Sequence, residues 1–308
     1  MTRRRDLPPG LGEAFAVRDA RASGVTARRL DARDLEAPFR GSRIRVTNAP
    51  SLDRYELREY ELRRRAQAYV PVAPRDAAFS HVTAARLLGM PLPERLFADE
   101  LHVTTSGQPP RRKGVAAHRS LDARRIEVRG FAVIPAEVVW LQLAPLLTLE
   151  ELIEAGDHLV RRKRPPCTLD SLAAEIVAAR GRRGVTAAAA ALPHLRAGTD
   201  SPRETRMRRT IVHAGFLEPA VGFRAHHEGA FIGTPDLAYP EYRIAFEYQG
   251  GGHREEDVFE EDIDRLERFH EAGWAVVQVT KGLLERRGWL AERTRRALLS
   301  RGWSPSSA

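Results

Sequence analysis

The sequence contains a single cysteine, Cys167, in 308 residues. One thiol excludes an intramolecular disulfide framework and a zinc site built from cysteines. The chain also lacks any run of about 18 apolar residues, so we expect no transmembrane helix. No apolar stretch follows the basic start MTRRRDLPPG, so we expect no secretory signal. Together these absences predict a cytoplasmic protein.

Lysine is scarce as well, and it occurs only at Lys113, Lys163 and Lys281, so arginine carries nearly all of the positive charge. The formal net charge is +9 at pH 7. A basic balance suits a polyanionic partner such as nucleic acid. An arginine-rich, alanine-rich composition is equally typical of a GC-rich genome, so the charge alone leaves both explanations open.

The remaining composition is that of a globular protein, with 43% hydrophobic and 30% charged residues, and the length suits two or three domains. We predict the α/β (α+β) class. The pattern divides the chain into a small winged helix-turn-helix-like segment, a mixed α/β middle domain, a helical connector and a C-terminal α/β domain, at residues 1–50, 51–165, 166–199 and 200–303.

The first segment has the order helix, glycine turn, helix, strands, which is typical of a helix-turn-helix. Gly24 ends one helix, and Thr26 is the predicted N-cap of the next. We expect this second helix to carry Arg28, Arg29 and Arg33, which could face a DNA groove. A solvated arginine face is the alternative.

The middle domain reads as a charged helix at 54–69, a strand at 101–105, further strands near 126–134, and helices at 137–144 and 149–159. Three histidines, His81, His102 and His118, fall in this domain. Their spacing is irregular and we identify no acidic partner for them, so we expect no metal site there.

The C-terminal domain predicts the order α-β-β-β-α-β-α. Ser201 and Glu204 form a capping box that opens the first helix. The predicted strands cover 221–226, 231–239, 242–248 and 274–279, and the last helix covers 283–299.

Two carboxylates stand out in the stretch TPDLAYPEYRIAFEYQG, which begins at residue 234. Asp236 and Glu247 lie on strands joined by the turn at Pro240, and Glu247 interrupts an apolar run. Gln249 lies two residues further along and therefore shares the face of Glu247. Carboxylates brought together in a buried place repel one another, and a divalent cation such as Mg²⁺ removes that repulsion.

This arrangement resembles the PD-(D/E)XK nuclease superfamily, with Pro235-Asp236 as the "PD" and Glu247-Tyr248-Gln249 as "(D/E)XK". The order Glu247 to Gly250 and then His253 is more closely similar to the very-short-patch-repair (Vsr)-like endonucleases, over about residues 200–302. The segments FAVRDARASGVTARRL and FSHVTAARLLGMPLP resemble the N-terminal region of AbiE-type antitoxin proteins. The resemblance implies a restriction-endonuclease-like αβββαβα core behind an antitoxin-like region.

The resemblance implies a role for each site residue. Asp236 and Glu247 would bind Mg²⁺, for which Mn²⁺ could substitute, and the carbonyl of Tyr248 would be a third ligand. Glu204 would reach the metal through a water. The metal would activate a water and neutralise charge on the scissile phosphate.

Gln249 stands where the family has lysine, and it can form hydrogen bonds but carries no charge. His253 would act as general base or orient the water. Asp262 and Arg265 lie one helical turn apart and would form a local ion pair.

We therefore predict a metal-dependent DNA endonuclease with N-terminal DNA-binding modules, in DNA repair or phage defence. The alternative is a DNA-binding, antitoxin-like regulator whose nuclease fold is inactive. A third possibility is a partner protein of a defence or toxin-antitoxin system.

Overall fold

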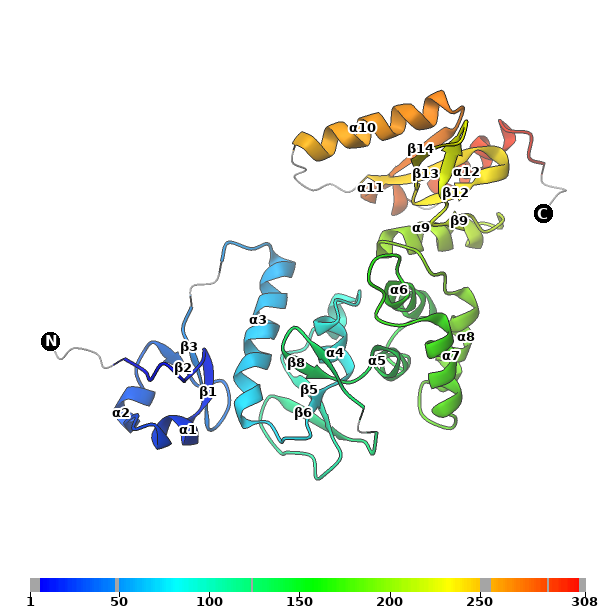
Figure 1. The fold of residues 1–308 in the computed structure, drawn as a ribbon. Helices are drawn as coiled ribbons and strands as arrows, with labels where there is room; N and C mark the ends of the chain where they lie inside the picture. The colour runs from blue at the N-terminus through cyan, green and yellow to red at the C-terminus, as the bar shows by residue number, and fades with distance from the viewer. Residues whose placement is uncertain (1–5, 48–49, 123, 250–255, 287, 305–308) are drawn as a thin grey trace. The chain divides into compact units, whose positions relative to one another are not determined.

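The computed structural model describes residues 6–47, 50–122, 124–249, 256–286 and 288–304 (Figure 1). The fold is α+β, as predicted, with four separate sheets and many helices. The chain forms two compact units, Met1–Leu143 and Ala144–Ala308, which we call the N-terminal and C-terminal units. None of the described helices combines the length and the apolar character that crossing a membrane requires.

The N-terminal unit begins with a small antiparallel sheet of order β1-β3-β2 and two short helices. These elements are β1 (Ala14–Ala16), α1 (Val17–Ala22), α2 (Ala27–Leu30), β2 (Leu35–Glu36) and β3 (Ser42–Arg45). Phe15, Ala20 and Leu30 form part of its core. Thr26 caps α2 as predicted, since its hydroxyl accepts a hydrogen bond from the amide of Arg29 at 3.3 Å.

The second part of this unit is a five-stranded mixed sheet of order β6-β5-β4-β8-β7. Strands β5 and β6 are parallel, as are β4 and β8. The predicted helix α3 (Arg54–Tyr69) precedes the sheet and is capped by Asp53 and Glu56. The remaining elements are β4 (Ala78–Phe79), α4 (His81–Leu87), β5 (Leu101–Thr105), β6 (Val115–Arg119), β7 (Ile126–Val128), β8 (Phe131–Val133) and α5 (Ala136–Leu143).

The C-terminal unit opens with four helices, α6 (Leu149–Leu159), α7 (Leu169–Ala178), α8 (Val185–Ala191) and α9 (Pro202–His213). Ion pairs join α6 to α9, and the pair between Asp157 and Arg208 is fully buried at 2.8 Å. Helix α6, which the sequence assigned to the middle domain 51–165, therefore belongs with the C-terminal unit, as does the predicted connector 166–199. The ion pairs between two distant helices explain the difference, because sequence patterns carry no such contact.

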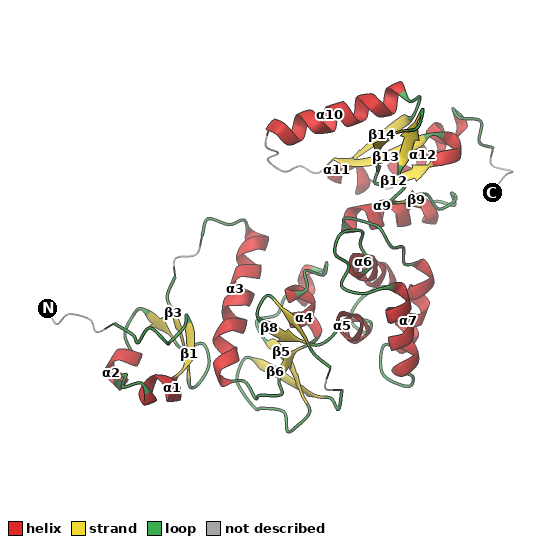
Figure 2. Cartoon of the chain, viewed as in Figure 1, coloured by secondary structure: helices red, strands yellow, loops and turns green. Residues whose placement is uncertain are grey.

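A four-stranded sheet of order β14-β13-β12-β9 forms the centre of the C-terminal unit (Figure 2). Strands β12 and β13 are antiparallel, and β13 and β14 are parallel. Its elements are β9 (Ala220–Val221), β12 (Leu237–Tyr239), β13 (Ile244–Gln249), α10 (Glu256–Glu271), β14 (Ala275–Thr280), α11 (Lys281–Leu284) and α12 (Trp289–Leu299). The predicted strand at 231–239 is wrong as one element. Residues 230–233 instead form β11 (Ala230–Gly233), which pairs with β10 (Ala225–His227) in a separate hairpin.

Apolar residues cover both faces of this sheet. Phe246 packs with Met207 of α9 and Leu290 of α12 on one face. Ala245 packs with Phe269 of α10 on the other. Because side chains alternate along a strand, the positions next to Phe246 on β13 point toward α10.

Candidate active site

Asp236 and Glu247 lie opposite each other at one end of the paired strands β12 and β13. The last paired residues are Leu237 and Phe246, so Asp236, immediately before β12, and Glu247, within β13, each lie one residue beyond them. Both alternate with residues that face α9 and α12, so both belong to the face covered by α10. The turn at Pro240 fixes this register and brings the two carboxylates to one end of the sheet.

Glu247 is buried, with 3% of its surface exposed. Arg265 of α10 donates from Nη2 to Oε2 of Glu247 at 3.1 Å. The local ion pair expected between Arg265 and Asp262 stays a prediction, since the side chain of Asp262 lies outside the described residues. Arg265 contacts Glu247 because α10 crosses the face on which Glu247 lies.

Asp236 is held from the neighbouring strand, because the amide of Tyr248 donates to its Oδ2 at 2.6 Å. Burial raises the pKa of Asp236 above its ordinary value, although this hydrogen bond and the charge of Arg265 act in the opposite direction. The carboxylate is therefore in a place that disfavours its charge.

Glu204 is the third carboxylate, and it lies in the first turn of α9. Its Oε2 accepts the amide of Asp200 at 2.8 Å, and its own amide donates to the hydroxyl of Ser201 at 3.3 Å. The predicted capping box is thus half formed, because Glu204 reaches the amide of Asp200 in place of that of Ser201. Burial and the nearby charge of Asp236 raise the pKa of Glu204 to about 7.

Two arginines contact residues next to these carboxylates. Arg162 donates from Nε to Asp200 at 2.9 Å, and its positive charge acts to lower the pKa of Asp236. The guanidinium carbon of Arg203 lies 5.1 Å from the centre of the Tyr248 ring. The sequence pattern did not indicate Arg162 and Arg203, because they follow a helix end and a helix cap and show no periodicity toward the site. The surroundings suit an anionic ligand beside a carboxylate centre.

Two predicted site residues remain, Gln249 and His253. Gln249 ends β13 and is half-buried beside the site. His253 lies outside the described residues. Within the part of the chain that the structure describes, the acidic residues of the C-terminal unit form no set of three whose ligand atoms all lie within 4.8 Å of one another.

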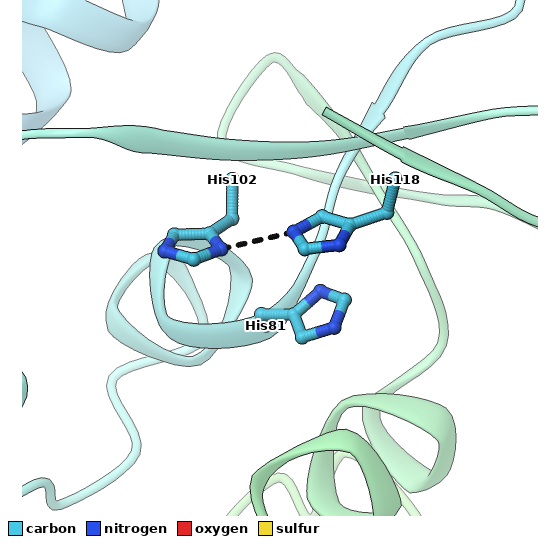
Figure 3. Close-up of side chains that lie close together, drawn as sticks. All are labelled: His81, His102 and His118. Atoms are coloured by element: carbon cyan, nitrogen blue, oxygen red, sulfur yellow. Dashed lines mark hydrogen bonds between the residues drawn. The ribbon is translucent and has the colours of Figure 1, made fainter. Parts of the chain in front are cut away.

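Three histidines in the N-terminal unit do form such a set, namely His81, His102 and His118 (Figure 3). Irregular spacing along the sequence thus does not keep the three rings apart, because α4, β5 and β6 each supply one of them. Nδ1 of His102 and Nε2 of His118 lie 3.1 Å apart. Sequence spacing could not show this, since the contact depends on the parallel pairing of β5 with β6.

The three arginines predicted to contact DNA differ in exposure and in secondary structure. Arg28 on α2 is exposed. Arg29 donates to both oxygens of Asp34 at 2.9 and 2.8 Å, and only 11% of its side chain is exposed. Arg33 is exposed but lies in the turn after α2, because this helix ends at Leu30. The prediction that one helix carries all three arginines is therefore wrong.

Comparisons with known proteins give relatives but no family. No protein-family profile matches the chain, and no solved structure matches it. The chain is 28% identical over 188 residues to the uncharacterized proteins MT2308 and Rv2248 of Mycobacterium tuberculosis strains CDC 1551 / Oshkosh and ATCC 25618 / H37Rv. The match covers 60% of this chain and 68% of each relative. These names describe no activity.

Proposed function

We propose that the C-terminal unit is a Mg²⁺-dependent nuclease that hydrolyses phosphodiester bonds of DNA. One observation carries the proposal: Asp236 and Glu247 lie at matching positions at one end of the sheet, beside a third carboxylate with a raised pKa. A cation is the ordinary way to relieve the repulsion of buried carboxylates. The N-terminal helix-turn-helix-like segment would bind the duplex through residues such as Arg28.

The donor set fits a hard divalent cation. Asp236 and Glu247 offer carboxylate oxygens, which Mg²⁺ and Mn²⁺ prefer. Oδ2 of Asp236 accepts the amide of Tyr248, so its Oδ1 is the oxygen that lies outside that bond. These two residues would hold the metal, with the carbonyl of Tyr248 as the proposed third ligand. When bound, the cation would neutralise charge on the scissile phosphate and activate the attacking water.

The chain's own residues would supply the rest of the chemistry. Glu204 would hold or release a proton near neutral pH, because its pKa of about 7 balances both forms. Its Oε2 already accepts an amide, so the proton would sit on Oε1. Gln249 would orient the attacking water by hydrogen bonds. Arg203, beside Tyr248, would bind a phosphate oxygen that is not attacked.

A second candidate function is a DNA-binding regulator with an inactive nuclease fold. Two features favour it: Gln249 replaces the lysine of the resembled family, and the guanidinium of Arg265 is hydrogen-bonded to Glu247. In this case Arg265 would compensate the charge of Glu247 without a metal. The regulator would bind a specific duplex with or without divalent cations, alone or with a partner protein of a defence or toxin-antitoxin system.

Cleavage of supercoiled plasmid in Mg²⁺, Mn²⁺ or chelator distinguishes the two. We expect metal-dependent nicking or linearisation by the full chain. Asp236→Asn and Glu247→Gln keep the size of each side chain and should lower the rate at least about 100-fold, as loss of a central electrostatic group does. Glu241→Gln is the matched control, because Glu241 is exposed at the opposite end of the same two strands.

Manganese binding, followed by calorimetry, completes the experiment. Cleavage that persists in both variants would refute the assignment of the site. Absence of cleavage and of manganese binding in the wild type, with duplex binding intact in chelator, would favour the regulator.

A further inference from the structure

Three imidazoles meet in the N-terminal unit, from elements far apart in sequence. His81 comes from the start of α4, while His102 and His118 come from β5 and β6 (Figure 3). The ring centres of His81 and His118 are 3.9 Å apart, and those of His102 and His118 are 5.3 Å apart. One ligand nitrogen from each ring can be chosen so that all three lie within 4.8 Å of one another.

One of these distances is close to that of a zinc site. Two nitrogens bound to one tetrahedral Zn²⁺ at about 2.0 Å lie about 3.3 Å apart, and Nδ1 of His102 and Nε2 of His118 lie 3.1 Å apart in a hydrogen bond. A bound ion would replace this hydrogen bond, and the stacked rings of His81 and His118 would turn so that one nitrogen of each ring faces the ion.

The cluster lies partly inside the N-terminal unit. Burial is the largest cause that lowers the pKa of each of the three histidines from its ordinary value.

Hydrogen bonds hold the backbone of His81 and His102 and involve the ring of His81. Nδ1 of His81 shares a hydrogen bond with the hydroxyl of Ser80 at 3.0 Å, which leaves Nε2 as the nitrogen outside that bond. The amide of His81 donates to Gln142 at 2.9 Å, and the amide of His102 donates to Thr83 at 2.8 Å. His81 also adopts a φ of +49°, a left-handed conformation that non-glycine residues rarely take. Such conformations concentrate at functional sites.

We propose that His81, His102 and His118 bind one Zn²⁺ ion. Imidazole nitrogen selects zinc over magnesium, so this site is separate in chemistry from the carboxylate centre of the C-terminal unit. The three rings are half-buried, so a water can take the fourth position. Three protein ligands with one open position are the pattern of zinc sites that exchange a ligand.

The test loads chelator-treated full-length protein with Zn²⁺ and measures bound metal by mass spectrometry and affinity by calorimetry. We expect one zinc per chain in the wild type and with His226→Gln, a control in which an exposed histidine of the C-terminal unit is changed. His102→Gln and His118→Gln should lower the affinity more than about 100-fold, which exceeds the usual effect of losing an outer hydrogen bond. Co²⁺ should give the visible absorption of a tetrahedral site in the wild type and lose it in both histidine variants.

The proposal is overturned if the wild type binds no zinc, or if the two histidine variants retain it. Circular dichroism checks whether these variants are folded. If they are not, X-ray absorption at the zinc edge of the wild type decides: three imidazole ligands support the proposal, and oxygen ligands alone refute it.

Discussion

The raised pKa of Glu204 predicts a specific dependence of stability on pH. An isolated glutamate titrates near 4.5, whereas Glu204 in the folded chain titrates near 7. Between these values the folded state keeps a proton that the unfolded state has lost. The free energy of unfolding therefore falls as pH rises from about 4.5 to about 7, and this contribution is flat outside that window.

The size of the effect follows from the interval between the two pKa values. Each pKa unit corresponds to about 1.4 kcal/mol, so the proton on Glu204 contributes about 3 kcal/mol at pH 4.5 or below that is lost by pH 8. Only 6% of Glu204 is exposed, so solvent screening reduces this value little. Most of the change falls between pH 5 and 8.

Glu204→Gln removes the titration while keeping the shape of the side chain. We expect the unfolding free energy of the variant, relative to the wild type, to rise by about 2–3 kcal/mol between pH 5 and pH 8. Urea denaturation in chelator, followed by tryptophan fluorescence, measures it, because Trp274, Trp289 and Trp303 lie in the C-terminal unit. Glu241→Gln, at an exposed site, should follow the wild type at both pH values.

The outcome that refutes this reasoning is a parallel pH dependence of wild type and Glu204→Gln. In that case Glu204 would be charged in the folded state near pH 5, and its role as a proton carrier would fail as well. Addition of Mg²⁺ provides an independent comparison. If a cation binds beside Glu204, it should stabilise the charged form and flatten the slope of the wild type.

Other expected outcomes concern packing and binding. Arg208→Leu leaves a buried partner charge uncompensated and should lower the unfolding free energy by about 3–5 kcal/mol in urea denaturation, against a few tenths for Arg296→Leu at an exposed pair. Gly233→Ala would place its Cβ 2.9 Å from an aromatic ring at a φ of +153°, and the same assay should show a loss of about 1–3 kcal/mol. Arg28→Ala should weaken duplex binding in a salt titration, and a larger effect of Arg29→Ala without loss of thermal stability would contradict the DNA-facing role of Arg28.

Elements with strong local signals could be predicted from the sequence. Helices α3 and α6 begin and end at the expected residues, because capping boxes at Asp53 and Thr148 define their starts. Strand β5 was also predicted at its observed bounds, since a short run of β-branched residues is flanked by turn residues.

Strand pairing was harder to predict. The stretch 231–239 begins and ends with apolar residues, but Pro235 has no amide hydrogen to donate to a neighbouring strand. The strand ends before Pro235, so β11 and β12 belong to different sheets. The pattern of apolar residues could not reveal this, because it describes burial and not the partner strand.

The candidate site shows the same limit. Asp236 and Glu247 stood out because a carboxylate in an apolar strand has few structural explanations. The three histidines were not expected to form a metal site and Arg265 was expected to pair locally, because the residues that they contact are distant in sequence. Their roles depend on where α10 crosses the sheet and on which strands pair.

The buried pair of Asp157 and Arg208 determines how the chain can be divided. A fragment starting at Ser201 would contain the whole predicted nuclease core, yet it would lack Asp157 and the carbonyl of His194, both of which accept from Arg208. The guanidinium of Arg208 would then lie on a helix surface that α6 normally covers and that the fragment leaves exposed. The smallest piece expected to fold by itself therefore begins near Ala144, and an expression trial or a domain swap should respect that boundary.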